Sequence, residues 1–204
     1  MKAVCVGSGS EGLQHPEITE AILSMVDQEK VSSKSFNVVY LGTCTYDLRG
    51  PMENQTKNLR AAGGNIIKLC VTNPSDRASF DELKELVTVT ADIIVISGGN
   101  TLFAMDVWRK IKLDVLLKEA ADSGVVMCGG SAGFICWFTG GHSDSWDPET
   151  YKNFMLDEAK NASEADLKKD EASAAPTNTA EVKSWRYLRV SNLNYFSVRL
   201  YYKR

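Results

Sequence analysis

Short apolar runs alternate along the chain with longer segments in which apolar residues recur every three or four positions. Continuous runs rich in Val and Ile are typical of strands buried on both faces, and the longer period is typical of helices with one apolar face. The expected strands are residues 2–6, 36–41, 65–69, 92–96 and 124–128. The expected helices are residues 17–28, 52–62, 80–87, 102–109 and 113–122. This alternation predicts successive βαβ units.

Such units predict an α/β fold, because right-handed crossovers place helices on both faces of a parallel sheet. We therefore expect a three-layer α/β/α architecture with a mainly parallel central sheet, within a single domain spanning residues 1–204. Its motif-bearing core comprises residues 1–150. Residues 161–180 are rich in Ala, Ser, Lys, Asp and Glu, and we expect a mobile surface segment there. The aromatic residues near the end, within 184–204, predict further strands.

Composition narrows the class of protein. With 44% hydrophobic and 24% charged residues the chain is typical of globular proteins, and its formal charge of −3 disfavours a nucleic-acid partner. No apolar run reaches the roughly 20 residues that span a bilayer, so we expect a cytoplasmic protein with no membrane partner. The five cysteines form no pair of Cys-x-x-Cys motifs, which disfavours a zinc or disulfide framework. We expect neither a metal nor a cofactor.

Ligands of parallel α/β sheets bind beyond the carboxyl ends of the strands, so the residues after each expected strand matter most. Residues 7–12 (GSGSEG) match the G-x-G-x-x-G pattern of dinucleotide-binding proteins. That site also needs an acid after the second strand and a helix that starts at the glycines, whereas residues 14–16 (QHP) intervene here. We interpret the segment as a flexible loop and keep nucleotide binding as an alternative.

A candidate nucleophile follows the fifth expected strand. Residues 129–133 (GGSAG) match G-x-S-x-G, and they lie between a buried strand and the apolar residues 134–138, expected as a helix. This is the context of a nucleophile elbow, in which a sharp turn exposes the serine hydroxyl. The pattern therefore indicates Ser131 as a nucleophile. The alternative is a glycine-rich turn with Ser131 as an N-cap.

Candidate oxyanion donors lie in two loops. Backbone N–H groups stabilise the negative oxygen that forms during acyl transfer. One such group belongs to Ala132, directly after the serine, and another to Gly98, Gly99 or Asn100 after the fourth strand. The alternative for the latter loop is a tight turn with Asn100 as an N-cap.

Residues 140–145 (GGHSDS) supply candidate partners for the serine. The chain has two histidines, His15 and His142, so a Ser-His-Asp enzyme completed within this segment would use His142. The alternative for His142 is an ordinary surface residue.

Three motifs in this order, GGNT at residues 98–101, GGSAG at 129–133 and GGHSDS at 140–145, resemble peptidase family S51. The resemblance covers roughly residues 1–150 and implies a fold similar to class I glutamine amidotransferases. It also implies a serine peptidase without metal or cofactor that hydrolyses small peptides, chiefly dipeptides with an N-terminal aspartate. Ser131 matches the nucleophile, Gly99 and Ala132 match the oxyanion positions, and Asp144 matches the acid of the triad.

The chain departs from the family near its end. The resemblance implies a catalytic histidine after a late strand, whereas residues 191–202 contain no histidine. It also implies further C-terminal strands, so we expect this chain to be truncated relative to the family. Three hypotheses follow: a homologue that binds substrate but hydrolyses it slowly, a truncated product, or a triad rewired through His142. If C-terminal strands are missing, an exposed sheet edge favours a homodimer.

Overall fold

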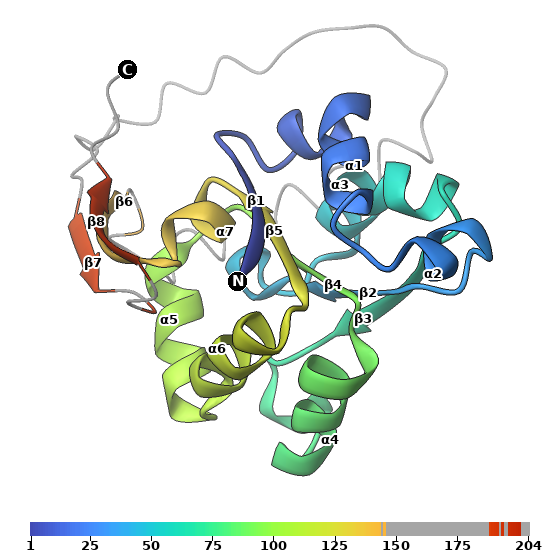
Figure 1. Cartoon of the computed structure of the whole chain (residues 1–204). Helices are drawn as coiled ribbons and strands as arrows, with labels where there is room; N and C mark the ends of the chain where they lie inside the picture. The colour runs from blue at the N-terminus through green and yellow to red at the C-terminus, as the bar shows by residue number, and fades with distance from the viewer. Residues whose placement is uncertain (144, 146–187, 192, 194–195, 201–204) are drawn as a thin grey trace, which may run out of the picture.

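The computed structural model describes residues 1–143, 145, 188–191, 193 and 196–200 (Figure 1). Its strands are β1 (Lys2–Val6), β2 (Asn37–Leu41), β3 (Asn65–Leu69), β4 (Ile93–Ile96), β5 (Val126–Gly130), β6 (Phe138–Ser143), β7 (Leu188–Ser191) and β8 (Phe196–Leu200). Its α-helices are α1 (Pro16–Leu23), α2 (Gln28–Ser32), α3 (Arg49–Ala61), α4 (Phe80–Lys84), α5 (Thr101–Lys110), α6 (Leu113–Ser123) and α7 (Ala132–Ile135). Shorter turns of helix are η1 (Gly12–Gln14), η2 (Thr43–Thr45), η3 (Pro74–Asp76) and the π-helical η4 (Glu85–Thr90).

The five predicted strands form one parallel sheet in the order β1-β5-β4-β2-β3. Because β5 lies between β1 and β4, the loops after β1 and β4 flank the loop after β5. The predicted end of the fifth strand at residue 128 is wrong by two residues. Pairing continues because Cys5 and Val6 lie opposite Gly129 and Gly130 in the register of β1 and β5.

Helices cover both faces of this sheet, which confirms the α/β/α prediction (Figure 1). Successive strand residues point to opposite faces, so each strand contributes to two apolar cores. Val38 of β2 packs in one core with Ile22 of α1 and Leu59 of α3. Val39 packs in the other with Trp108 of α5 and residues of α6.

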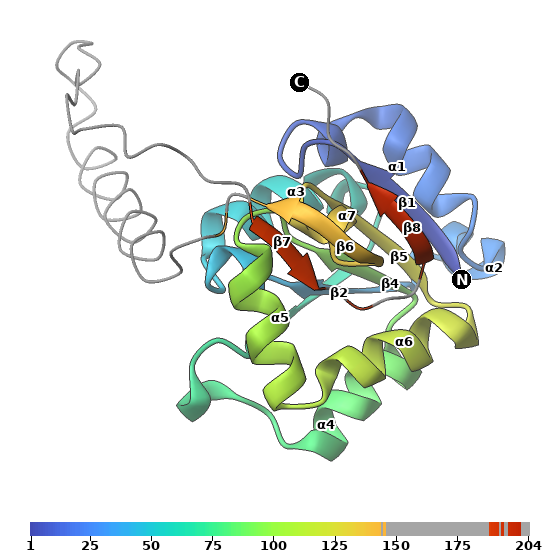
Figure 2. The ribbon, with the colours of Figure 1, turned by 90° about the vertical axis from the view of Figure 1, so that its left-hand side faces the viewer.

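A second, smaller sheet has the order β7-β6-β8 (Figure 2). β6 pairs antiparallel with β7 and parallel with β8. Between β7 and β8, Leu193 is buried in the core, and its N–H donates to the carbonyl of Cys136 at 2.8 Å. The C-terminal segment is thereby attached to the main domain beside α7, and two of its stretches are strands, as predicted.

Two helix predictions need correction. A helix follows Ser131 as expected, but its predicted extent over residues 134–138 is wrong, because α7 spans Ala132–Ile135 and Phe138 begins β6. Glycines at 140 and 141 disfavour a helix, and β7 and β8 supply strand partners instead. The helix expected over residues 17–28 ends earlier, because α1 stops at Leu23. A separate helix, α2, begins at Gln28, where the Asp27 side chain caps it by accepting a hydrogen bond from Glu29 N.

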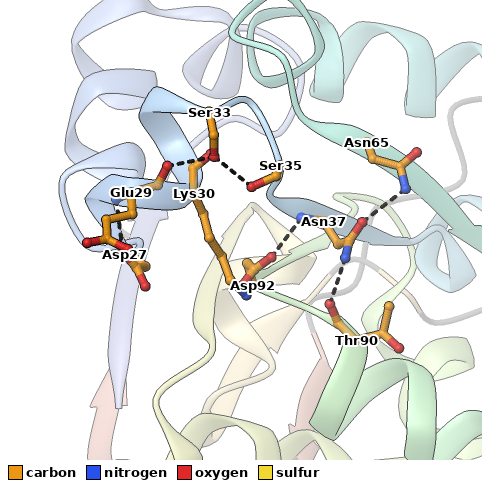
Figure 3. Close-up of polar contacts among 9 residues, drawn as sticks. All are labelled: Asp27, Glu29, Lys30, Ser33, Ser35, Asn37, Asn65, Thr90 and Asp92. Atoms are coloured by element: carbon orange, nitrogen blue, oxygen red, sulfur yellow. Dashed lines mark hydrogen bonds and ion pairs between the residues drawn. The ribbon is translucent and has the colours of Figure 1, made fainter.

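Polar contacts tie the amino ends of the strands together (Figure 3). The Asp92 carboxylate accepts hydrogen bonds from Asn37 N at 2.8 Å and Lys30 Nζ at 2.7 Å, and this bond raises the pKa of Lys30. The Asp92 carbonyl accepts from Val126 N, and Asn65 donates to the Asn37 side chain. These bonds hold β2, β3, β4 and β5 in register at the amino ends of the strands. The candidate site lies at the opposite, carboxyl ends.

Candidate active site

Ser131 occupies a sharp turn between β5 and α7. Its backbone has φ 52° and ψ −114°, and residues other than glycine rarely adopt such a positive φ. The turn is held by Ser131 N, which donates to the Val6 carbonyl at 3.2 Å, and by the Ser131 carbonyl, which accepts from Phe134 N and Ile135 N. Ser131 is exposed, whereas residues 125–130 and 132–133 are all buried. The fold therefore presents this one residue at the carboxyl edge of the sheet.

Gly129 and Gly133, two positions before and after Ser131, are required by close packing. A Cβ atom on Gly133 would lie 2.1 Å from the carbonyl oxygen of Ile96, and one on Gly129 would lie 2.6 Å from the carbonyl oxygen of Gly133. Such distances are far inside van der Waals contact, so the turn packs against β4 only without side chains here. The G-x-S-x-G spacing is thus explained by the geometry of the turn.

The loop after β4 lies beside the serine. A Cβ atom on Gly98 would lie 3.5 Å from Ser131 Cβ. Gly99 has φ 115°, and a Cβ there would lie 2.3 Å from the Cys44 carbonyl oxygen. The second glycine is therefore needed both for its backbone conformation and for its close approach to η2.

The four residues predicted as oxyanion donors differ in their hydrogen bonds. Ala132 is the first residue of α7, so its N–H has no acceptor within that helix. Gly98 N and Gly99 N donate to no acceptor among the residues that the structure describes. Asn100 N, by contrast, donates to the Cys44 carbonyl at 2.8 Å. This leaves Ala132, Gly98 and Gly99 with N–H groups available for a ligand.

Asn100 instead has a structural position. Its side chain accepts a hydrogen bond from Phe103 N at 2.9 Å, which caps α5, and donates to the Tyr46 hydroxyl at 3.0 Å. The side chain is 1% exposed. It therefore connects the start of α5 to Tyr46, which follows η2. Asn100 comes directly after the Gly98–Gly99 pair in the sequence.

The predicted general base, His142, lies near the end of β6. The backbone of His142 lies opposite Arg189 of β7. Asp144 lies outside the described residues. Ser143 and Ser145, on either side of it in the sequence, are buried and bonded to each other at 2.7 Å, and Ser145 accepts a hydrogen bond from Thr101 N at 2.9 Å. The end of the GGHSDS segment is thus attached to the start of α5, next to the GGNT loop.

The other histidine lies on the surface. His15 precedes α1, its side chain is 63% exposed, and its Nδ1 is 3.9 Å from the Glu17 carboxylate. The glycine loop that precedes it serves packing: a Cβ on Gly130 would lie 2.4 Å from Gly9 N. Since η1 follows these glycines and α1 begins only at Pro16, no long helix starts at them, as a pyrophosphate site requires.

Sequence reasoning missed a polar side chain in this region. Gln55 of α3 is 6% exposed and lies against the Gly9 loop. A signal for it exists, because Gln55 falls on the apolar face of the predicted helix, four positions before the buried Leu59. Cys44 of η2, whose carbonyl lies against Gly99, is buried. Burial raises the pKa of its thiol to about 12, which makes this cysteine a poor nucleophile.

The fold and this geometry define an α/β protein with an exposed serine on a strained strand-to-helix turn, framed by two glycine loops. The sequence profile of Peptidase family S51 matches residues 4–161. The chain belongs to peptidase family S51. The resemblance noted in the three motifs is therefore confirmed.

Two curated relatives share parts of the sequence. The chain is 30% identical over 170 residues to a protein named G2/mitotic-specific cyclin-1 from Trypanosoma brucei brucei, covering 76% of this chain and 49% of that protein. It is 48% identical over 59 residues to the uncharacterized peptidase YgaJ from Bacillus subtilis (strain 168), covering 29% of this chain and 26% of YgaJ. The chain thus spans about half the length of the first of these relatives, and its match to the second is shorter still.

Two solved structures share the fold. A peptidase E protein from Listeria monocytogenes EGD-e superposes with a TM-score of 0.55 at 17% identity, covering 78% of this chain and 87% of that one. A peptidase from an acI-B1 Actinobacterium gives 0.54 at 22% identity, covering 72% and 60%. In the described part of this chain, no helix is long and apolar enough to cross a bilayer.

Proposed function

We propose that this chain is a serine-type peptidase in which Ser131 is the nucleophile. The observation that carries the proposal is the exposed Ser131 at φ 52° on a turn whose other residues are buried. Such a backbone costs about 1–3 kcal/mol and persists only where the surrounding structure enforces it, which is common at active sites. Membership of family S51 supports the same reading.

The reaction follows from the groups around the turn. The Ser131 oxygen attacks the carbonyl carbon of the scissile peptide bond, and the resulting oxyanion accepts hydrogen bonds from Ala132 N and Gly99 N. The C–N bond then breaks, and the amine leaves with the proton that came from the serine. Water hydrolyses the acyl ester and restores the Ser131 hydroxyl.

The general base is the second part of the proposal. We assign it to His142, with Asp144 orienting the imidazole, because Ser143 and Ser145 anchor this segment beside the GGNT loop. A positioned base contributes about 10²–10⁴-fold to the rate. The competing function is a binding protein that keeps the anion-binding loops without a working base; it is favoured by the surface position of His15 and the scarcity of other histidines.

The proposed substrates are small peptides, chiefly dipeptides with an N-terminal aspartate. This assignment rests on the S51 motifs, and no side chain described at the site specifies it by itself. It is therefore tested with matched substrates that differ only in the first residue.

The first prediction concerns hydrolysis of an Asp-Leu dipeptide by the full chain, with Leu-Leu as the matched substrate. Ser131→Ala should lower kcat by more than about 10³-fold, as expected for loss of a nucleophile. His142→Ala should lower it by about 10²-fold or more. Ser24→Ala, a serine at the end of α1 near the opposite edge of the sheet, should leave it unchanged.

The outcomes separate the hypotheses. Turnover that Ser131→Ala leaves intact contradicts the serine mechanism. Serine-dependent turnover that survives His142→Ala contradicts the assigned base. Binding of Asp-Leu without turnover, measured by calorimetry, contradicts the peptidase and supports the binding protein.

A further inference from the structure

Gln55 is a polar side chain in an apolar setting. It lies on the buried face of α3 with Thr56 and Leu59, and it is 6% exposed. Thr56 satisfies its hydroxyl within the helix, by donating to the Met52 carbonyl at 2.7 Å. Gln55 Oε1 is fully enclosed and has no hydrogen-bond partner among the described residues. An apolar side chain of the same size would avoid this desolvation cost, so folding alone does not account for a glutamine here.

The Gln55 carboxamide stands where two loops meet. A Cβ atom on Gly9 would lie 3.5 Å from Gln55 Nε2 and 3.2 Å from Gly98 N. The amide of Gln55 and the peptide of Gly98 therefore flank the same side of Gly9. This places the side chain at the junction of the loops after β1 and β4.

Both of these loops contact the serine turn. Gly9 lies against Gly130, where a Cβ atom would be 2.4 Å from Gly9 N. Gly98 lies against the same turn, because a Cβ on it would be 3.3 Å from the Gly130 carbonyl oxygen and 3.5 Å from Ser131 Cβ. The spacing between the two loops thus fixes where the Gly98–Gly99 peptides stand relative to Ser131.

We propose that Gln55 is a positioning residue that sets this spacing and thereby aims the Gly99 N–H at the oxyanion formed on Ser131. The proposal rests on the proposed function for its catalytic consequence. A glutamine suits the position because its planar amide places polar atoms at this junction, with Nε2 beside Gly9, while Oε1 has no partner among the described residues. Alignment errors of about 1 Å in such a site lower rates by about 10²-fold.

The test replaces Gln55 by Met, which keeps the length and removes both polar atoms. We expect Gln55→Met to lower kcat for Asp-Leu by at least about tenfold with KM changed less than about threefold, since oxyanion contacts act mainly in the transition state. The melting temperature should stay level or rise, because an unpaired buried carbonyl is removed. Thr56→Val, the neighbouring buried position on α3, should leave kcat unchanged.

A second readout does not depend on turnover. Hydrogen exchange of the peptide covering residues 97–101, followed by mass spectrometry, should be faster in Gln55→Met than in the wild type and unaltered in Thr56→Val. Unchanged exchange there overturns the positioning role. So does an unchanged kcat in an active enzyme, or a loss of kcat that Thr56→Val reproduces. A wild-type chain without turnover overturns the proposed function, and the exchange rates then decide on Gln55 separately.

Discussion

At the scale of single residues, the site depends on the lack of a side chain at its glycines as much as on the Ser131 hydroxyl. Ser131 bears strain in its own backbone, while Gly129, Gly133 and Gly99 let neighbouring segments approach closer than any side chain permits. The sequence pattern identified these positions, because G-x-S-x-G after a buried strand has a mechanical reason. The pattern did not reveal that Asn100 N is already bonded to Cys44.

A prediction at this scale concerns Gly133. Gly133→Ala places a Cβ atom 2.1 Å from the Ile96 carbonyl oxygen, so the backbone must shift. We expect the free energy of unfolding to fall by about 3 kcal/mol, at the upper end for overpacked sites, as measured by urea denaturation. Gly50→Ala is the matched control, since nothing lies within 4 Å of its Cβ position in α3. A stability loss equal in the two variants would contradict the packing argument.

At the scale of elements, most boundaries follow from local chemistry. The apolar runs became the five parallel strands, and the three- and four-residue spacing became helices on both faces. The exceptions arise where a cap or a strand partner intervenes. The predicted helix over residues 17–28 stops at Leu23, and Asp27 caps a separate helix, α2. The pairing of β6 with β7 and β8 turns part of an apolar stretch into a strand.

The start of α5 gives a prediction for an element. Asn100→Ala removes both the helix cap and the bond to Tyr46, so we expect a loss of about 2 kcal/mol in unfolding free energy. Asn100→Ser should recover about half of this, because serine caps helices but cannot replace the amide donor. Urea titrations of the three proteins measure the difference. Equal stabilities for the Ala and Ser variants would show that the cap contributes nothing.

At the scale of the whole molecule, buried thiols report on the integrity of the fold. Desolvation raises the pKa of Cys5 to about 11 and of Cys44 to about 12, and it also raises the pKa values of Cys128 and Cys136. At pH 8 these four thiols are therefore protonated in the native protein and react slowly with a disulfide reagent. Cys44, Cys128 and Cys136 are buried, whereas Cys5 and the remaining free cysteine, Cys70, are half-buried.

We accordingly expect a single rapidly reacting thiol at pH 8, removed by Cys70→Ser, with the other four reacting only on unfolding. As the pH rises towards 11, Cys5 should ionise and become the second to react. Absorbance of the released thiolate counts the reactive groups. Two or more fast thiols at pH 8 in the native protein would contradict this assignment.

The sequence by itself determined the fold class, the order of the strands along the chain and the serine turn, because each depends on local periodicity and on glycine at fixed spacing. It also contained the three motifs that identify family S51. The tertiary structure decided which loops meet. Only the strand order β1-β5-β4 brings the Gly9 and Gly98 loops against Ser131, and only the folded structure places Gln55 of α3 at the junction of these two loops. Contacts between segments far apart in the chain depend on how the strands are ordered in space, and no local pattern encodes that order.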